Sequence, residues 1–64
     1  LVSNIMRKYR ILKTFLYGEK ITLSILDIKQ ERVFIRVSYT HLTLLTGEGT
    51  EEDIELDNIT SITL

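Results

Sequence analysis

The chain has 64 residues, with no cysteine, no proline and a formal net charge of −1 at pH 7. This length allows one domain, residues 1–64, with a thin core that we expect self-association to supplement. The lack of cysteine excludes disulfides and thiolate metal sites and fits a reducing compartment, so we predict a cytoplasmic protein. No apolar run approaches the roughly 18 residues that span a bilayer, and no signal peptide is indicated, so no membrane partner is predicted.

Charge is distributed unevenly along the chain. Residues 1–20 contain five basic residues and one acidic residue, a balance of +4. Residues 21–64 contain three basic and eight acidic residues, a balance of −5. The two parts are expected to attract each other within the fold or between subunits. A basic face for nucleic acid is the alternative interpretation.

Residues 4–17 are predicted to form an amphipathic helix. Its apolar stripe has helical spacing and consists of Ile5, Tyr9, Leu12 and Leu16. Arg7 and Arg10 lie away from this stripe. Ser3 or Asn4 is placed to cap the first turn, and Gly18 to end the helix in the left-handed conformation. The alternative is a hairpin that pairs residues 9–16 with residues 20–26.

From Glu19 onward the apolar period changes to two, which is typical of strands. Five strands are predicted, over residues 20–28, 32–39, 41–46, 53–57 and 59–64. Their connections are too short for parallel crossovers, so we expect an antiparallel meander, with Asn58 at a tight bend before the last strand. The predicted fold is mainly β: an N-terminal helix followed by a five-stranded meander that rolls into a small barrel.

One predicted strand combines basic and aromatic side chains. With strict alternation, Arg32, Phe34 and Arg36 point to the same side, an arrangement that can stack nucleobases and hold phosphate. Together with Arg7 and Arg10, they are the candidate contacts to nucleic acid or to a protein partner. The alternative is that Phe34 packs under the helix or a partner subunit while the arginines pair with nearby acids.

The acidic segment near the C-terminus is predicted to be a solvated turn and strand face. Glu51, Glu52 and Asp53 belong to a turn, and Glu55 and Asp57 alternate with apolar residues, so they do not converge on a shared centre as a calcium site requires. His41 is the single histidine and lacks the second ligand or base that zinc binding or nucleophilic catalysis needs. We therefore predict no catalytic, cofactor-binding or metal-binding residue, and no enzymatic activity.

The outline of one helix and five short strands resembles the Sm-like fold, the small bent barrel of the Sm and Hfq proteins. Residues 59–62, Ile-Thr-Ser-Ile, match the pattern that closes that fold, and residues 54–59 are similar to the end of the YolD-like small barrels of bacteria. The resemblance implies a small barrel and, for Sm proteins, RNA binding. However, residues 34–36 lack the family's glycine, residues 38–45 lack its Asp and Asn, and Leu56-Asp57 replaces its Arg-Gly pair. Acids also stand where the closing loop of Hfq carries Lys and His, so the RNA-binding residues of the family do not carry over.

Two classes of function follow from these observations. The first is a non-enzymatic interaction module that forms a homo-oligomer or docks on a protein partner. The second is an Sm- or Hfq-like RNA-binding protein that uses the basic and aromatic strand or the helix. An enzyme is a third and weaker interpretation. The fold alone does not decide between them, because one small barrel supports many functions.

Overall fold

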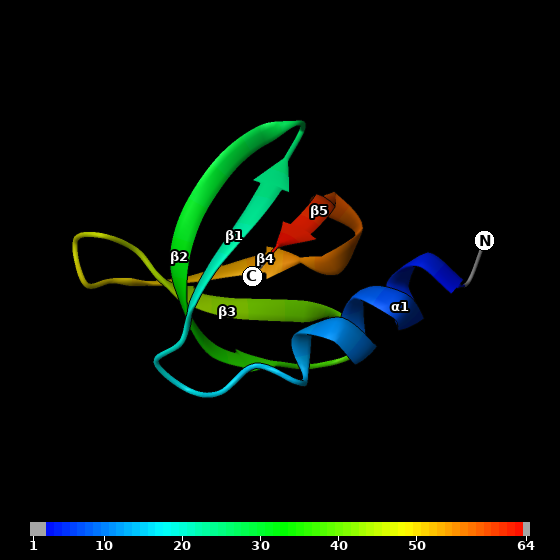
Figure 1. Ribbon diagram of the computed structural model, residues 1–64, viewed down its shortest axis with the longest axis horizontal. Coiled ribbons are helices and arrows are strands. Elements are labelled where there is room, and N and C mark those ends of the chain that lie inside the picture. The colour runs from blue at the N-terminus through cyan, green and yellow to red at the C-terminus, as the bar shows by residue number, and fades with distance from the viewer. Residues whose placement is uncertain (1–2, 64) are drawn as a thin grey trace.

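The computed structural model describes the backbone of residues 3–63 (Figure 1). One helix, α1 (Ser3–Leu12), precedes the strands β1 (Lys20–Ile25), β2 (Ile28–Val37), β3 (His41–Leu45), β4 (Glu51–Glu55) and β5 (Ile59–Thr63). A 3₁₀ turn, η1 (Leu56–Asn58), joins the last two strands. The prediction of a mainly β fold with one helix followed by five antiparallel strands is confirmed.

The five strands form one open sheet with the order β4-β3-β2-β1-β5. Strands β1 to β4 pair in succession, as a meander should, but β5 pairs with β1 and not with β4. The predicted meander is therefore wrong for the last strand. Because β4 and β5 are the two edges, the sheet is open and the predicted barrel closure is not seen between them.

The 3₁₀ turn explains why β5 does not pair with β4. Leu56 is fully buried, its N–H donates to the carbonyl of Thr40 at 3.0 Å, and its own carbonyl accepts a hydrogen bond from Lys8 Nζ at 3.0 Å. These contacts fix η1 beneath α1, so the chain is carried away from β4 before β5 begins. Asn58, the predicted bend residue, ends this turn.

Helix α1 is shorter than predicted. Beyond Leu12 the N–H groups of Thr14 and Phe15 donate to carbonyls three residues earlier, which tightens and ends the helix. Phe15 consequently enters the core, and Leu16 is 74% exposed, so the predicted apolar stripe is wrong at Leu16. The competing hairpin is also excluded, because residues 9–12 are helical. The side chains of the predicted caps Ser3 and Asn4 lie outside the described part of the chain.

Gly18 does not cap the helix but lies in the turn that leads into the sheet. Its φ of +88° is the left-handed conformation that the sequence predicted for this glycine, although at a different structural position. Its N–H donates to the carbonyl of Phe34 at 2.8 Å, and the N–H of Phe34 donates to the carbonyl of Glu19 at 2.8 Å. This pair of bonds joins the turn to β2.

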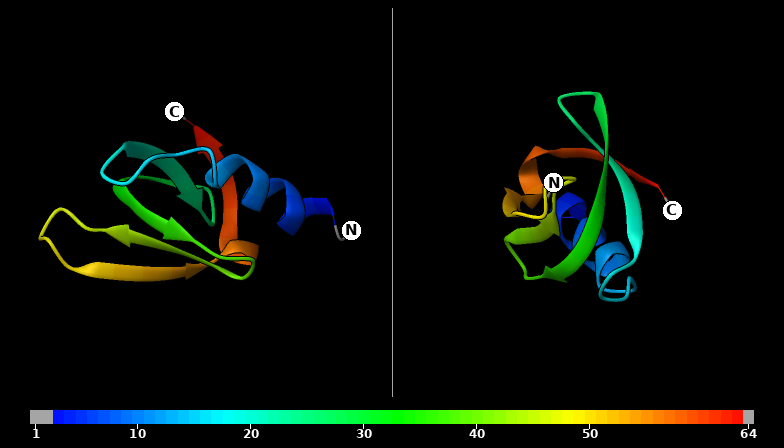
Figure 2. Two further views of the ribbon diagram at one scale, coloured as in Figure 1. Left: turned by 90° about the horizontal axis from the view of Figure 1, so that it is seen from below. Right: turned by 90° about the vertical axis from the view of Figure 1, so that its left-hand side faces the viewer.

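The core lies between α1 and the concave side of the curved sheet (Figure 2). Its members are apolar and buried, and they come from the helical segment, all five strands and η1: Leu12, Phe15, Ile21, Leu23, Phe34, Leu42, Leu44, Ile54, Leu56 and Ile59. The helix is held against the sheet by this cluster, because burying apolar area is the main stabilising term in a domain of this size.

The β1–β2 connection is a two-residue turn at Leu26 and Asp27, both with positive φ (52° and 66°). The sequence predicted one strand to end at residue 28 and the next to begin at residue 32, but residues 28–31 belong to β2. Two-residue turns with both central φ angles positive match the twist of the flanking strands, which explains the backbone but not the choice of leucine. Leu26 and Ile28 leave an apolar, exposed tip on this hairpin.

Candidate functional site

A β-bulge in β2 separates the predicted basic and aromatic row. The register places Phe34 opposite Leu44 and Arg36 opposite Thr43, so Ile35 is the extra residue. Directly opposed residues share a face of the sheet. Phe34 therefore lies on the concave face with Leu44, whereas Arg36 lies on the convex face. The prediction that Arg32, Phe34 and Arg36 share one side is wrong, because one inserted residue reverses the alternation.

Phe34 belongs to the core. It is 5% exposed, and its ring lies 5.9 Å from the ring of Phe15 in a tilted arrangement. A ring in this position is not available to stack on a nucleobase at the surface. The alternative raised from the sequence, that Phe34 packs beneath the helical segment, describes the observed position.

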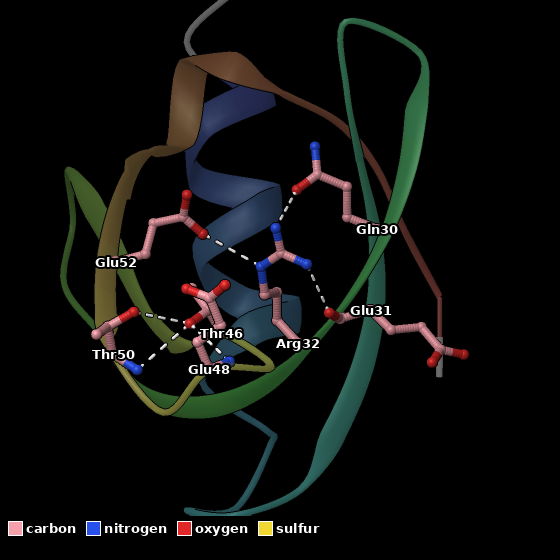
Figure 3. Close-up of polar contacts among 7 residues, drawn as sticks. All are labelled: Gln30, Glu31, Arg32, Thr46, Glu48, Thr50 and Glu52. Carbon is pink, nitrogen blue, oxygen red and sulfur yellow. Dashed lines mark hydrogen bonds and ion pairs between the residues drawn. The ribbon is translucent and has the colours of Figure 1, made fainter.

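Arg32 lies at the edge of the concave face, and its side chain contacts residues of β2 and β4 (Figure 3). Its Nε donates to Glu52 Oε1 at 3.2 Å, and its second terminal nitrogen donates to Gln30 Oε1 at 2.7 Å. The remaining terminal nitrogen donates to the backbone carbonyl of Glu31 at 2.8 Å. Every nitrogen of the guanidinium is thus engaged, which identifies Arg32 as a structural cross-link between β2 and β4.

Arg36 has a much looser environment. Its guanidinium lies 3.8 Å from Glu51 Oε1, and both side chains are more than half exposed. Exposed ion pairs of this kind contribute little to stability. Arg36 is therefore free to exchange its partner.

Arg7 and Arg10 lie on the exposed face of α1, three residues apart. This spacing places them on the same side of the helix, opposite the side with Tyr9 and Leu12. Met6 and Ile11 flank them and are 39% and 49% exposed. We call these four residues, Met6, Arg7, Arg10 and Ile11, the basic helix face. The structure thus separates the predicted contact residues: the two helix arginines lie together, and the strand residues lie elsewhere.

A pocket of about 270 Å³ opens where α1, the start of β3 and the end of β4 meet. Its lining combines two apolar or aromatic walls with polar and acidic groups: Ile5, Tyr39, Thr40, His41, Glu55 and Asp57. We call it the acidic pocket. Its volume lies below the roughly 300–1,000 Å³ of most small-molecule sites, which suits a single side chain better than a metabolite.

Local backbone pairing explains how the acidic pocket forms. His41 and Glu55 are directly opposed on β3 and β4, and Asp57 follows in η1. The Tyr39 ring packs in a tilted arrangement against the ring of Tyr9 from α1, with 4.6 Å between the ring centres, which positions the aromatic wall. Thr40 Oγ1 and His41 Nδ1 are 2.8 Å apart, which holds the imidazole at the rim.

Sequence reasoning missed this pocket. It treated His41 as isolated and Glu55 and Asp57 as a solvated face. The correct register of β3 against β4 would have brought His41 and Glu55 together, but a two-residue period does not determine register.

The described residues contain no group of three or more histidine, cysteine, aspartate and glutamate side chains placed to hold a metal ion. In the same part of the chain, no helix has the length and apolar character required to cross a membrane. Comparisons with protein-family models, with curated proteins and with solved structures found no significant match.

Proposed function

We propose that this protein is a non-enzymatic interaction module, built on a small curved sheet with two open edges, that self-associates in the cytoplasm. The observation that carries the proposal is the pair of sheet edges. Strands β4 and β5 each pair with one neighbour in the described structure. An unpaired edge presents backbone N–H and C=O groups to any strand of another chain.

The two edges differ in how strongly their side chains oppose pairing with a strand of another chain. Strand β4 carries Glu51, Glu52, Asp53 and Glu55, and such charges oppose pairing with an identical strand. Strand β5, Ile59–Thr63, has neither a charge nor a proline. We infer that β5 is the edge through which copies of the chain meet, and that the assembly is closed, a dimer in the simplest case.

The small size of the domain supports the same proposal. Below about 70–80 residues a single core contributes only ~3–5 kcal/mol, and the chain has no disulfide that could add to it. Burial of β5 against a second copy would remove an edge and add apolar contact. Self-association would thus compensate for the thin core.

The experiment is the molar mass of the full chain, measured by light scattering over a hundredfold range of concentration, for the wild type and for Ser61→Lys. Ser61 is exposed on β5 and makes no side-chain hydrogen bond in the described structure, so its replacement leaves the fold intact. We expect a closed oligomer for the wild type and at least tenfold weaker association for Ser61→Lys. The control Ser61→Thr adds no charge and should associate as the wild type does.

Sm-like RNA binding is the second candidate, and the basic helix face is the observation that favours it. RNA binding through β2 lacks support, because Phe34 is buried and the guanidinium of Arg32 is hydrogen-bonded to Glu52 and Gln30. Arg7 and Arg10 are exposed and side by side, which suits phosphate contacts. Titration of a fluorescent uridine-rich RNA at two salt concentrations tests this candidate. Salt-sensitive binding that Arg7→Ala weakens would support it.

A further inference from the structure

Among the residues that the structure describes, the basic helix face has no acidic partner. Among residues 3–63 the ion pairs join Arg32 with Glu52 and Arg36 with Glu51, so both basic members come from β2. In the helical segment, Lys8 donates to a backbone carbonyl, and Lys13 lies 5.6 Å from the centre of the Tyr9 ring. In this part of the chain, therefore, no ion pair joins the basic first part to the acidic remainder.

The carboxylates of the acidic pocket likewise have no basic partner among the described residues. Glu55 and Asp57 are exposed and form no ion pair in the described structure. Beside them, Ile5 and Tyr39 provide aliphatic and aromatic walls, and Tyr39 is 65% exposed. A long basic side chain fits this combination, because its apolar stem can lie along the walls while its charged head meets the carboxylates.

We propose that the acidic pocket of one copy receives Arg7 or Arg10 from the helix of a second copy, and that this contact determines how the copies are oriented. The inference rests on the self-association proposed above and adds a specific ionic contact to it. Charge complementarity selects a second copy as the occupant: the donor has a balance of +4 over residues 1–20 and the acceptor one of −5 over residues 21–64.

Two further features of the surface fit this contact. Met6 and Ile11 flank the arginines, and methionine and arginine are enriched in the centres of protein interfaces. Helix α1 also contacts η1, which contributes Asp57 to the pocket and leads directly into β5. The donor, the acceptor and the proposed β5 edge therefore all adjoin η1, so one assembly could use all three.

The test is a charge exchange between donor and acceptor in the full chain. One variant carries Arg7→Glu and Arg10→Glu, and the other carries Glu55→Lys and Asp57→Lys. Alone, each variant places like charges in the contact, and we expect self-association to weaken at least tenfold. In an equimolar mixture, each helix meets a pocket of opposite charge in both directions, so mixed oligomers should form with affinity close to that of the wild type.

Matched controls separate this contact from a change in net charge. Lys20→Glu with Lys29→Glu changes the net charge by the same amount as the helix variant, and Glu31→Lys with Glu48→Lys matches the pocket variant. All four control positions are exposed and lie outside the acidic pocket. Sedimentation velocity of each variant and of the mixtures at 50 and 500 mM salt is the readout, with circular dichroism to verify folding. The controls should associate as the wild type does, and high salt should weaken the wild-type assembly.

Each contrary outcome has a distinct meaning. If both charge-reversed variants associate as the wild type does, the ionic contact is overturned and the proposed self-association stands. A wild-type chain that remains monomeric at all concentrations overturns both proposals. If the helix variant keeps its mass but loses binding to a uridine-rich RNA, the basic helix face is a nucleic-acid surface, and the contact with a second copy is overturned.

Discussion

At the scale of single residues, two arginines of the same strand have different roles. Arg32 is directly opposed to Ile21 and faces the concave side, where its guanidinium meets both Gln30 and Glu52. Arg36 follows the bulge, faces the convex side and meets only Glu51, at the longer distance of 3.8 Å. The difference arises from one inserted residue, not from the chemistry of the side chains. The first contact is also partly buried, so solvent and salt screen it less than the second.

Neighbouring glutamates allow a direct comparison of these two ion pairs. We expect Glu52→Gln to lower the free energy of unfolding by about 1 kcal/mol, because it removes a charge that faces a partly buried guanidinium. Glu51→Gln is the matched control and should cost less than about 0.5 kcal/mol, because that pair is exposed. Urea denaturation of both variants measures the two values. Equal losses would contradict the structural role assigned to Arg32.

At the scale of secondary-structure elements, the β1–β2 hairpin contains the least favourable backbone of the described chain. Among residues 3–63, Leu26 and Asp27 are the non-glycine residues with positive φ, and Leu26 is also 78% exposed. A leucine in the left-handed region is disfavoured by contact between its Cβ and the backbone. The side chain has little burial to compensate for this strain.

Replacing the turn with Asn-Gly should therefore stabilise the fold. We expect the double variant Leu26→Asn, Asp27→Gly to raise the free energy of unfolding by roughly 1 kcal/mol, because both residues favour positive φ at these positions. Leu16→Asn is the control, since Leu16 is similarly exposed and lacks a positive φ. It should change stability by less than about 0.5 kcal/mol in urea denaturation. No gain in the turn variant would show that Leu26 is not strained.

Most elements could be predicted from the sequence, and the failures have specific physical causes. Strand β3 begins at His41 as predicted, because short apolar alternation with turns on both sides is a strong local signal. The bulge at Ile35 and the pairing of β5 with β1 depend on contacts between distant segments, and neither has a local signal. The acidic pocket was missed for the same reason, because it requires the register of β3 against β4. Arg7 and Arg10 could be placed on an exposed helix face because helical periodicity is local.

At the scale of the whole molecule, the proposed self-association through β5 predicts that folding depends on protein concentration. If the native chain is a dimer and the unfolded chain is not, a higher protein concentration favours the native state by mass action. Each tenfold increase contributes ~1.4 kcal/mol per dimer, or about 0.7 kcal/mol per chain. For a domain of this size, that corresponds to a rise of roughly 3–6 °C in the thermal midpoint.

We therefore expect the thermal midpoint of the wild type, followed by circular dichroism, to rise by roughly 3–6 °C for each tenfold increase in concentration. The variant with Arg7→Glu and Arg10→Glu should show a midpoint that hardly changes, because its native state would be largely monomeric over the same range. The variant with Lys20→Glu and Lys29→Glu should behave as the wild type does, since the two variants have equal net charge. A wild-type midpoint that stays constant over a hundredfold range would mean that the single chain is stable alone, and that association is not needed to supplement its core.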